Sequence, residues 1–158
     1  KRIEMSTEIG VWEIIDGKLK LVDFFSLGSR REYEDLENGL KTINYSSEGI
    51  LIIGEQVHTK SGPLDLLGID QSGNLIIVEL KRDKLPREVI AQALDYVSDI
   101  SSWDLDKVSD ECLKFSGLSF EEYLNENFEE IEFEDLKVNE NQRILLVGFS
   151  IDEPREND

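Results

Sequence analysis

The sequence predicts an α/β fold in which a central mixed β-sheet is flanked by helices. Two apolar runs, at 64–69 and 75–80, are separated by a short turn sequence, and both faces of the hairpin that they would form are apolar. A sheet whose two faces are both covered has this pattern. An amphipathic helical pattern opens near Pro86 and reaches Ile100, and Ser119 with Glu122 predicts a capped helix that runs to about Glu130. An apolar run at 143–150 predicts a last buried strand. The 158 residues suffice for one compact domain.

The first element is a predicted β-hairpin within residues 1–26. The segments VWEII and KLKLVDFF alternate apolar and polar residues on either side of Asp16-Gly17. An Asp-Gly pair is typical of a two-residue hairpin turn. We expect this hairpin to pack on the core or to mediate dimerisation.

A short helix and a core strand are expected next, and with them begins the main domain, at residues 27–151. Tyr33, Leu36 and Leu40 recur at helical spacing and predict an amphipathic helix. The segment 48–57 contains four consecutive apolar residues and predicts a core strand, and residues 60–63 predict the connecting loop.

The central hairpin has a register that its turn predicts. A three-residue loop with Gly73 in the left-handed conformation would pair Asp70 with Asn74. In that register Asp65 lies directly opposite Glu79, at the end of the hairpin away from the turn. One face would then carry Leu67, Ile69, Leu75 and Ile77, and the other Leu64, Leu66, Ile76, Val78 and Leu80.

The facing carboxylates of Asp65 and Glu79 predict a metal site. Like charges directly opposed in a sheet are destabilising, and a half-buried carboxylate without a partner is costlier still. A divalent cation would resolve this conflict, and oxygen ligands favour Mg²⁺ or Mn²⁺. Lys81, two residues after Glu79, could stabilise an anion or hold an attacking water. The alternative is a structural ion pair between Lys81 and either carboxylate.

These residues resemble the PD-(D/E)xK nuclease superfamily. Asp65 followed by Glu79 and Lys81, as E-L-K, is similar to its central motif, and Gln92 with Tyr96, in AQALDY, resembles the Q-x-x-x-Y element of the RecB-like branch. The spacing is similar to that of NucS-type endonuclease domains, and the resemblance is clearest over residues 48–96. It implies a restriction-endonuclease-like core that hydrolyses phosphodiester bonds in DNA with Mg²⁺ or Mn²⁺.

The resemblance also implies a role for each site residue. Asp65 and Glu79 would ligate the metal together with the carbonyl of Leu80, and Lys81 would orient or activate the water. Gln92 and Tyr96 would support the lysine and contact the nucleic-acid backbone.

A further acid on a helix before the sheet is expected from the same resemblance. Glu37 flanks the inner stripe of the predicted helix and is the candidate ligand, acting directly or through water. Glu34 takes its place if the helix is rotated, and an ordinary surface glutamate is the alternative for Glu37.

The net charge of −18 argues against nucleic-acid binding, because affinity for phosphate comes largely from basic groups. However, residues 106–140 hold twelve acids and three lysines, so half of the net charge lies in that segment, which we interpret as a solvated face. The region beside the proposed site has a local excess of two positive charges. Its basic residues, which we expect near phosphate, are Lys81, Arg82, Lys84 and Arg87.

Cysteine usage and hydropathy predict a cytoplasmic protein. The single cysteine, Cys112, excludes an internal disulfide, and no apolar run approaches the ~20 residues of a membrane span. Cys112 and the one histidine, His58, have no companions for a nucleophilic dyad or a zinc cluster, and we assign them no chemistry. The polar tail at 152–158 and the start at Lys1 favour a domain cut from a longer chain.

The function predicted is therefore a metal-dependent DNA endonuclease of repair, restriction or defence. A homodimer is expected if both strands of a duplex are cut, and a further domain or protein partner is expected outside this segment. The alternative is a catalytically inactive nuclease-like module whose acidic surface docks a basic protein partner.

Overall fold

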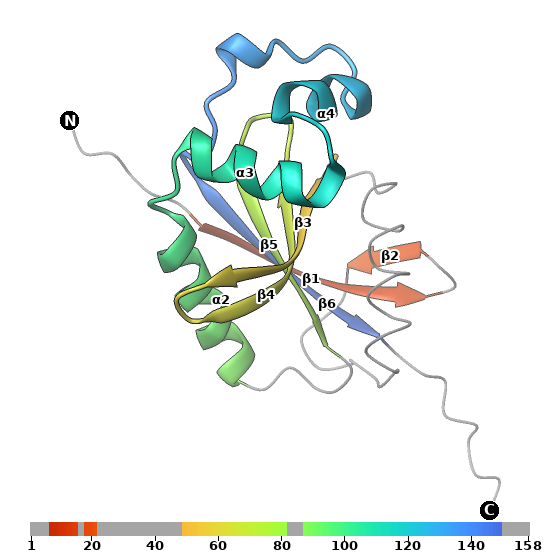
Figure 1. Cartoon of the computed structure of the whole chain (residues 1–158). Helices are drawn as coiled ribbons and strands as arrows, with labels where there is room; N and C mark the ends of the chain where they lie inside the picture. The colour runs from red at the N-terminus through yellow and green to blue at the C-terminus, as the bar shows by residue number, and fades with distance from the viewer. Residues whose placement is uncertain (1–6, 16–17, 22–48, 82–86, 150–158) are drawn as a thin grey trace, which may run out of the picture.

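The computed structural model describes residues 7–15, 18–21, 49–81 and 87–149 of the chain. Its centre is a mixed sheet of six strands in the order β2-β1-β6-β5-β4-β3 (Figure 1). β6 lies parallel to both β1 and β5, and the other neighbours are antiparallel. The strands are β1 (Thr7–Ile15), β2 (Lys18–Leu21), β3 (Leu51–Thr59), β4 (Gly62–Ile69), β5 (Leu75–Lys81) and β6 (Gln142–Phe149). The expected α/β class is confirmed.

Among the described residues, three α-helices lie between β5 and β6 in the chain and pack on the sheet. They are α2 (Arg87–Ile100), α3 (Leu105–Ser116) and α4 (Phe120–Asn127), followed by a short 3₁₀ turn, η1 (Phe133–Asp135). Because β5 and β6 are parallel neighbours, the chain needs a crossover between them, and these helices form it. No helix among the described residues is long and apolar enough to cross a membrane.

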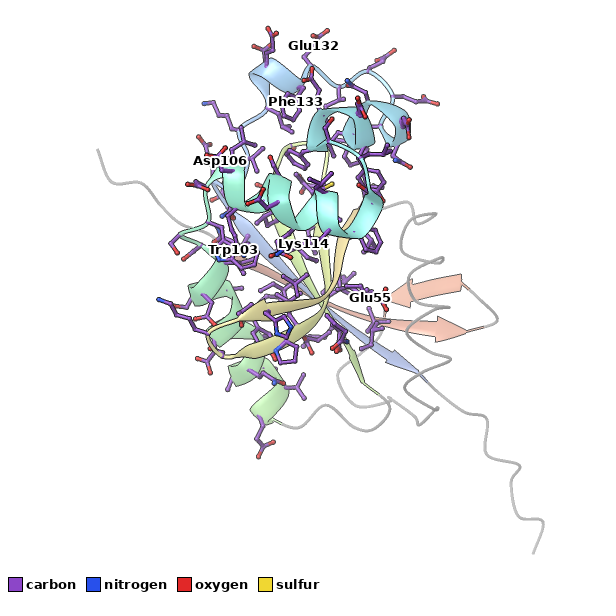
Figure 2. All side chains as sticks on the ribbon, in the orientation of Figure 1. Glu55, Trp103, Asp106, Lys114, Glu132 and Phe133 are labelled. Atoms are coloured by element: carbon purple, nitrogen blue, oxygen red, sulfur yellow. The ribbon has the colours of Figure 1, made fainter. Side chains whose placement is uncertain are left out.

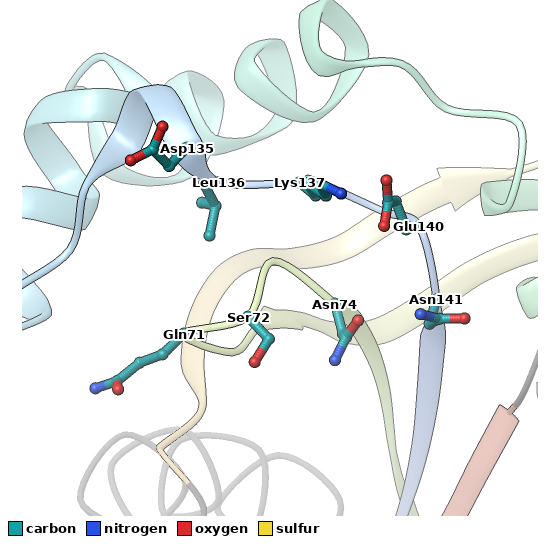
Figure 3. Close-up of a pocket in the computed structure, with 8 residues that line it drawn as sticks. All are labelled: Gln71, Ser72, Asn74, Asp135, Leu136, Lys137, Glu140 and Asn141. Atoms are coloured by element: carbon teal, nitrogen blue, oxygen red, sulfur yellow. The ribbon is translucent and has the colours of Figure 1, made fainter.

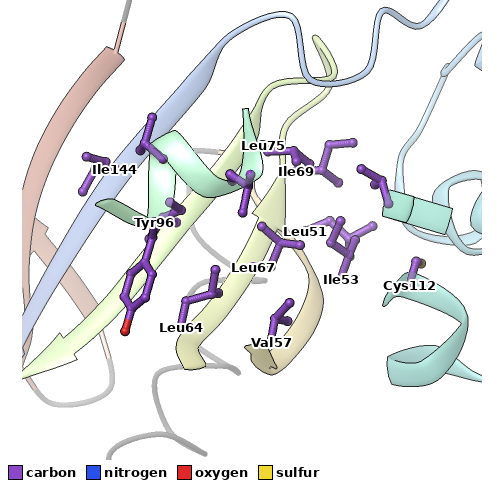
Figure 4. Packing of buried hydrophobic residues seen from close by; sticks show 14 of the residues in the cluster. Leu51, Ile53, Val57, Leu64, Leu67, Ile69, Leu75, Tyr96, Cys112 and Ile144 are labelled. Atoms are coloured by element: carbon purple, nitrogen blue, oxygen red, sulfur yellow. The ribbon is translucent and has the colours of Figure 1, made fainter. Parts of the chain in front are cut away.

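The hydrophobic core has two parts, one on each face of the sheet. The helix-side cluster joins the sheet to buried residues of α2, α3 and α4, and Figure 4 shows Tyr96 of α2 beside Leu64 and Leu67 of β4. The opposite cluster contains Leu66, Val78 and their neighbours in β3, β5 and β6. Both faces of the central hairpin are therefore buried, as its sequence predicts.

The register predicted for the central hairpin is confirmed. Leu66 pairs with Val78 and Ile69 with Leu75, which is the alignment that the predicted turn requires. Gly73 has a φ of +88°, and its N–H donates to the carbonyl of Asp70 at 3.1 Å. The turn is held further by the Asp70 carboxylate, which accepts from the N–H groups of Ser72 and Asn74.

Other predicted elements are confirmed with shifted ends. The N-terminal hairpin is present as β1 and β2, and β1 also pairs with β6, so the hairpin extends the main sheet. The helix predicted after Pro86 begins at Arg87, and Ser119 caps α4 by accepting the N–H of Glu122, although α4 ends at Asn127 instead of near residue 130.

Two expectations were wrong in detail, and one helix was not predicted. The predicted loop over 60–63 is shorter, because Thr59 pairs with Gly62 and β4 already begins there. The strand expected over 48–57 runs instead from Leu51 to Thr59. Helix α3 was not predicted within the acidic segment 106–140.

Leu64 lies on the opposite face from the one predicted. It belongs to the helix-side cluster with Leu67, whereas strict alternation along β4 places it with Leu66. The pleat is interrupted between Leu64 and Leu66, at Asp65, and this interruption shapes the candidate site.

Candidate functional site

Asp65 and Glu79 lie against each other where β4 and β5 separate. The N–H of Asp65 donates to Oε1 of Glu79 at 3.2 Å, and the N–H of Leu80 donates to Oδ2 of Asp65 at 2.8 Å. Each carboxylate therefore accepts a backbone N–H from the other strand. Glu79 is only 2% exposed, so this contact brings carboxylate charge into a buried environment.

The backbone pairing of β4 with β5 stops at Asp65 and Glu79, and the two carboxylates act as hydrogen-bond acceptors there. The β4–β5 backbone pairs run from Ile69–Leu75 to Leu66–Val78, and the next position is Asp65 opposite Glu79. There the side-chain carboxylates accept the N–H groups of Asp65 and Leu80. Because buried backbone donors need partners, the two acids satisfy the sheet at the point where the strands part.

Helix α2 contributes Gln92 and Tyr96, which form a hydrogen-bonded pair. The amide of Gln92 donates to the hydroxyl oxygen of Tyr96 at 2.9 Å, and that hydroxyl donates to the carbonyl of Pro63 at 3.0 Å. Burial raises the pKa of Tyr96, and the nearby charges of Glu79 and Asp65 raise it further. The tyrosine is therefore held as a neutral donor within electrostatic reach of both acids.

The turn between β3 and β4 is attached to α2 at a second point. The N–H of Ser61 donates to Oδ2 of Asp99 at 2.8 Å. The pKa of Asp99 is lowered, mainly because the Ser61 side chain also hydrogen-bonds to its carboxylate. Together with Tyr96 and Pro63, this contact fixes the strand that carries Asp65 against the helix.

Gln56 also contacts the site, although it was not among the predicted site residues. Gln56 of β3 directs its side-chain amide to Oδ1 of Asp65 at 3.4 Å, and its φ is +48°. The left-handed conformation is uncommon for a residue that is neither Gly nor Asn. Nothing in the sequence around Gln56 signals this conformation.

The structure describes the remaining predicted residues only in part. Lys81 is the last residue of β5, two positions after Glu79, and Arg87 opens α2, but their side chains lie outside the described part of the chain. Outside the described residues altogether are Glu34, Glu37, Arg82 and Lys84.

The donor set at this site suits a hard divalent cation. Asp65 and Glu79 supply carboxylate oxygens, and each carboxylate has about four acceptor positions, so hydrogen bonding and metal binding are compatible. Among the residues that the structure describes, no group of three potential ligands is brought together, and the predicted third acid, Glu37, is not among them. The described part of the site thus provides two metal-compatible side chains.

The acidic segment lies away from these carboxylates. Asp106 of α3 and Glu132 beside η1 lie in the α3–α4 part of the molecule (Figure 2). The end of the segment packs over the β4–β5 turn, where the N–H of Asn139 donates to the carbonyl of Gly73. Asp65 and Glu79 lie at the other end of that hairpin, so the end of the acidic segment is separated from them by the length of the hairpin.

A hollow of about 410 Å³ lies at that turn (Figure 3). Its lining is mostly polar and comes from the turn and from the segment before β6: Gln71, Ser72, Asn74, Asp135, Leu136, Lys137, Glu140 and Asn141. It contains none of the predicted site residues and lies at the opposite end of the hairpin from the carboxylates.

Together these features define an α/β domain with two facing acids on its central hairpin and a Gln-Tyr pair on the covering helix. That is the arrangement which the resemblance to the PD-(D/E)xK superfamily implies. Residues 35–142 match the model of a family described as the Endonuclease NucS C-terminal domain. Since the match covers more than half of the chain, the chain belongs to this family.

Individual relatives carry the same name. The chain is 29% identical over 87 residues to Endonuclease NucS of Sulfolobus acidocaldarius, which is 55% of this chain and 34% of the relative. It is 40% identical over 52 residues to Endonuclease NucS of Aeropyrum pernix, which is 33% of this chain and 20% of the relative. The chain thus corresponds to a minor part of each relative's length. No solved structure matches it significantly.

Proposed function

We propose that this chain is the nuclease domain of a metal-dependent DNA endonuclease. The observation that carries the proposal is the pair of buried-strand carboxylates at the end of the hairpin, within a family named for an endonuclease. Glu79 accepts the N–H of Asp65, and Asp65 accepts the N–H of Leu80, so the two carboxylates lie beside each other. Family membership favours this function over the non-catalytic docking module.

Asp65 and Glu79 would hold Mg²⁺ or Mn²⁺, with the carbonyl of Leu80 and the carboxylate of Glu37 as further candidate ligands. When bound, such an ion supplies Lewis-acid stabilisation of charge on the phosphoryl oxygens and lowers the pKa of water. The fit rests on donor chemistry, because these ligands are all oxygen atoms, which Mg²⁺ and Mn²⁺ prefer.

The other residues have roles that follow from their positions. Lys81, at the end of β5, would orient the attacking water and offset negative charge at phosphorus. Tyr96 joins α2 to the backbone before Asp65 through the carbonyl of Pro63, and Gln92 orients the Tyr96 hydroxyl. Gln92 and Tyr96 would thereby position the DNA strand that is cut relative to the two acids.

DNA is the proposed substrate despite the acidic composition. Lys81, Arg82, Lys84 and Arg87 occur in the sequence from the end of β5 to the start of α2 and give that stretch a positive balance. The overall charge of −18 implies weak binding, and salt should weaken it further by screening the contacts of these basic residues with phosphate.

The complete protein has further proposed features. We place it in the cytoplasm, in DNA repair, restriction or defence. A homodimer would supply the two sites needed to cut both strands of a duplex. Other domains would set the DNA structure that is recognised, because the chain matches only 34% and 20% of the lengths of the two relatives.

Replacing the lysine tests the assigned chemistry. We expect Lys81→Ala to lower the rate of DNA cleavage by roughly 10²-fold or more, because it removes the positive charge that is proposed to stabilise the transition state. Mn²⁺ affinity, measured by calorimetry, should change little. Lys137→Ala is the matched control, since Lys137 lines the hollow at the far end of the hairpin. Equal turnover by Lys81→Ala and the parent would contradict the assigned role.

A further inference from the structure

Gln56 lies opposite Asp65 in the β3–β4 ladder. The flanking pairs, Glu55 with Leu66 and Val57 with Leu64, place it there. Its φ of +48° falls in the left-handed region within a strand, which costs free energy for a residue with a β-carbon. A sequence selected for strand stability alone would place Gly or Asn at this position.

The left-handed residue coincides with the interruption of the pleat. Leu66 belongs to the opposite cluster, so alternation would put both Val57 and Leu64 on that face two positions later. Both instead belong to the helix-side cluster, where Figure 4 shows them near Leu67. The change of face falls between these pairs, where Gln56 is opposite Asp65.

The contact with Gln56 gives the Asp65 carboxylate a second hydrogen-bond donor. Nε2 of Gln56 lies 3.4 Å from Oδ1, and the N–H of Leu80 lies 2.8 Å from Oδ2. Two donors from different strands, one on each oxygen, restrict rotation of the carboxylate plane about its last torsion. Partners that orient a metal ligand in this way commonly govern its affinity for the metal.

We propose that Gln56 is a positioning residue for the carboxylate of Asp65. Its left-handed backbone turns β3 so that its amide reaches Oδ1, and the amide presets the orientation in which Asp65 ligates a divalent cation. This inference rests on the proposed function, since it assigns Asp65 the role of a metal ligand.

Calorimetric titration with Mn²⁺ tests the proposal on the parent and on Gln56→Gly. Glycine adopts a φ of +48° without strain, so the melting temperature of the metal-free variant should equal or exceed that of the parent. Its affinity for Mn²⁺ should nevertheless fall about tenfold. Cleavage by Gln56→Gly should be impaired at low Mn²⁺ and largely restored at saturating Mn²⁺.

Two further variants make the outcome specific. Gln56→Asn tolerates the left-handed conformation but is one methylene shorter, so its affinity should also fall. His58→Ala, at an exposed position two residues further along β3, should bind Mn²⁺ like the parent. Unchanged affinity in both Gln56 variants, or a loss of affinity that accompanies a lower melting temperature, would overturn the positioning role. A parent that binds no Mn²⁺ at Asp65, shown by an identical titration of Asp65→Ala, would overturn the proposed metal site itself.

Discussion

At the residue scale, the site is a point where side chains replace backbone pairing. Asp65 and Glu79 accept N–H groups across the end of the β4–β5 ladder. Tyr96 donates to the carbonyl of Pro63, two residues before Asp65. The same groups therefore contribute to the stability of the fold and to the proposed chemistry. The effect of a substitution here on cleavage therefore has to be compared with that of a substitution elsewhere that lowers the free energy of unfolding by the same amount.

Tyr96→Phe allows such a comparison. The change removes a buried hydroxyl and leaves the carbonyl of Pro63 without its donor, so the free energy of unfolding should fall by about 1–2 kcal/mol. Gln92 also loses its acceptor. We expect DNA cleavage to fall by at least about tenfold, because the backbone before Asp65 is no longer fixed to α2. Urea unfolding and a cleavage assay provide the two measurements.

Tyr123→Phe is the matched control. The hydroxyl of Tyr123, on α4, also donates to a backbone carbonyl, that of Ile52, at 2.8 Å, and burial leads the effects that raise its pKa to about 12. Its loss should lower the free energy of unfolding by a similar ~1–2 kcal/mol while cleavage stays at the parent level. Equal losses of cleavage in the two variants would mean that Tyr96 acts through stability alone.

The sequence predicts which residues are neighbours where their spacing along a hairpin or a helix determines the contact. The turn register places Asp65 opposite Glu79, and Gln92 and Tyr96 are one helical turn apart, so their contacts could be foreseen. Gln56 could not be foreseen, because its conformation and its contact arise from the pairing of β3 with a strand that comes later in the chain. Glutamine carries no local preference for a positive φ.

At the scale of elements, the β4–β5 turn joins the central hairpin to the segment before β6. The carbonyl of Gly73 accepts the N–H of Asn139 at 2.8 Å, and the Asn139 amide donates to the carbonyls of Ile100 and Trp103. Gln142 in turn donates to Oδ1 of Asn139. This buried network connects the turn to the end of α2 and to the start of the central strand β6.

Gly73→Ala is expected to disrupt this connection. A β-carbon at Gly73 would lie close to the backbone carbonyl of Lys137, and the φ of +88° adds strain. We expect the free energy of unfolding to fall by at least about 2 kcal/mol. The control is Gly117→Ala, where φ is +73° but no atom lies within 4 Å of the added carbon. That variant should lose only about 1 kcal/mol, and an equal loss in both would show that the turn does not contact this segment closely.

The elements that the sequence predicted are those with strong apolar periodicity or a definite turn sequence. Helix α3 was missed because its buried face includes a charged residue, Glu111. Burial raises the pKa of the Glu111 carboxylate, but Lys107 and Lys114 form ion pairs with it at 2.9 and 3.3 Å. The two lysines together outweigh burial, so the pKa of Glu111 is lowered. Compensation of this kind depends on side-chain geometry and does not appear in a hydrophobic pattern.

At the scale of the whole molecule, charge is distributed unevenly along the sequence. Half of the net charge lies in residues 106–140, and the end of that segment contacts the β4–β5 turn, where Asn139 donates to the carbonyl of Gly73. The basic residues of 81–87 begin in the sequence at the last residue of β5, after the end of the hairpin that carries Asp65 and Glu79. In the proposed nuclease these basic residues would bind phosphate, and binding should weaken as salt increases.

The most direct test of the central claim is cleavage of labelled single-stranded, duplex and branched DNA at low salt with Mn²⁺ or Mg²⁺. The parent should cut at least one of these substrates, and cutting should stop both with EDTA, which removes the metal ion, and in Asp65→Ala, which removes one of its proposed ligands. Cutting that survives in Asp65→Ala or in EDTA would contradict the account, as would a parent that cuts none of the three substrates.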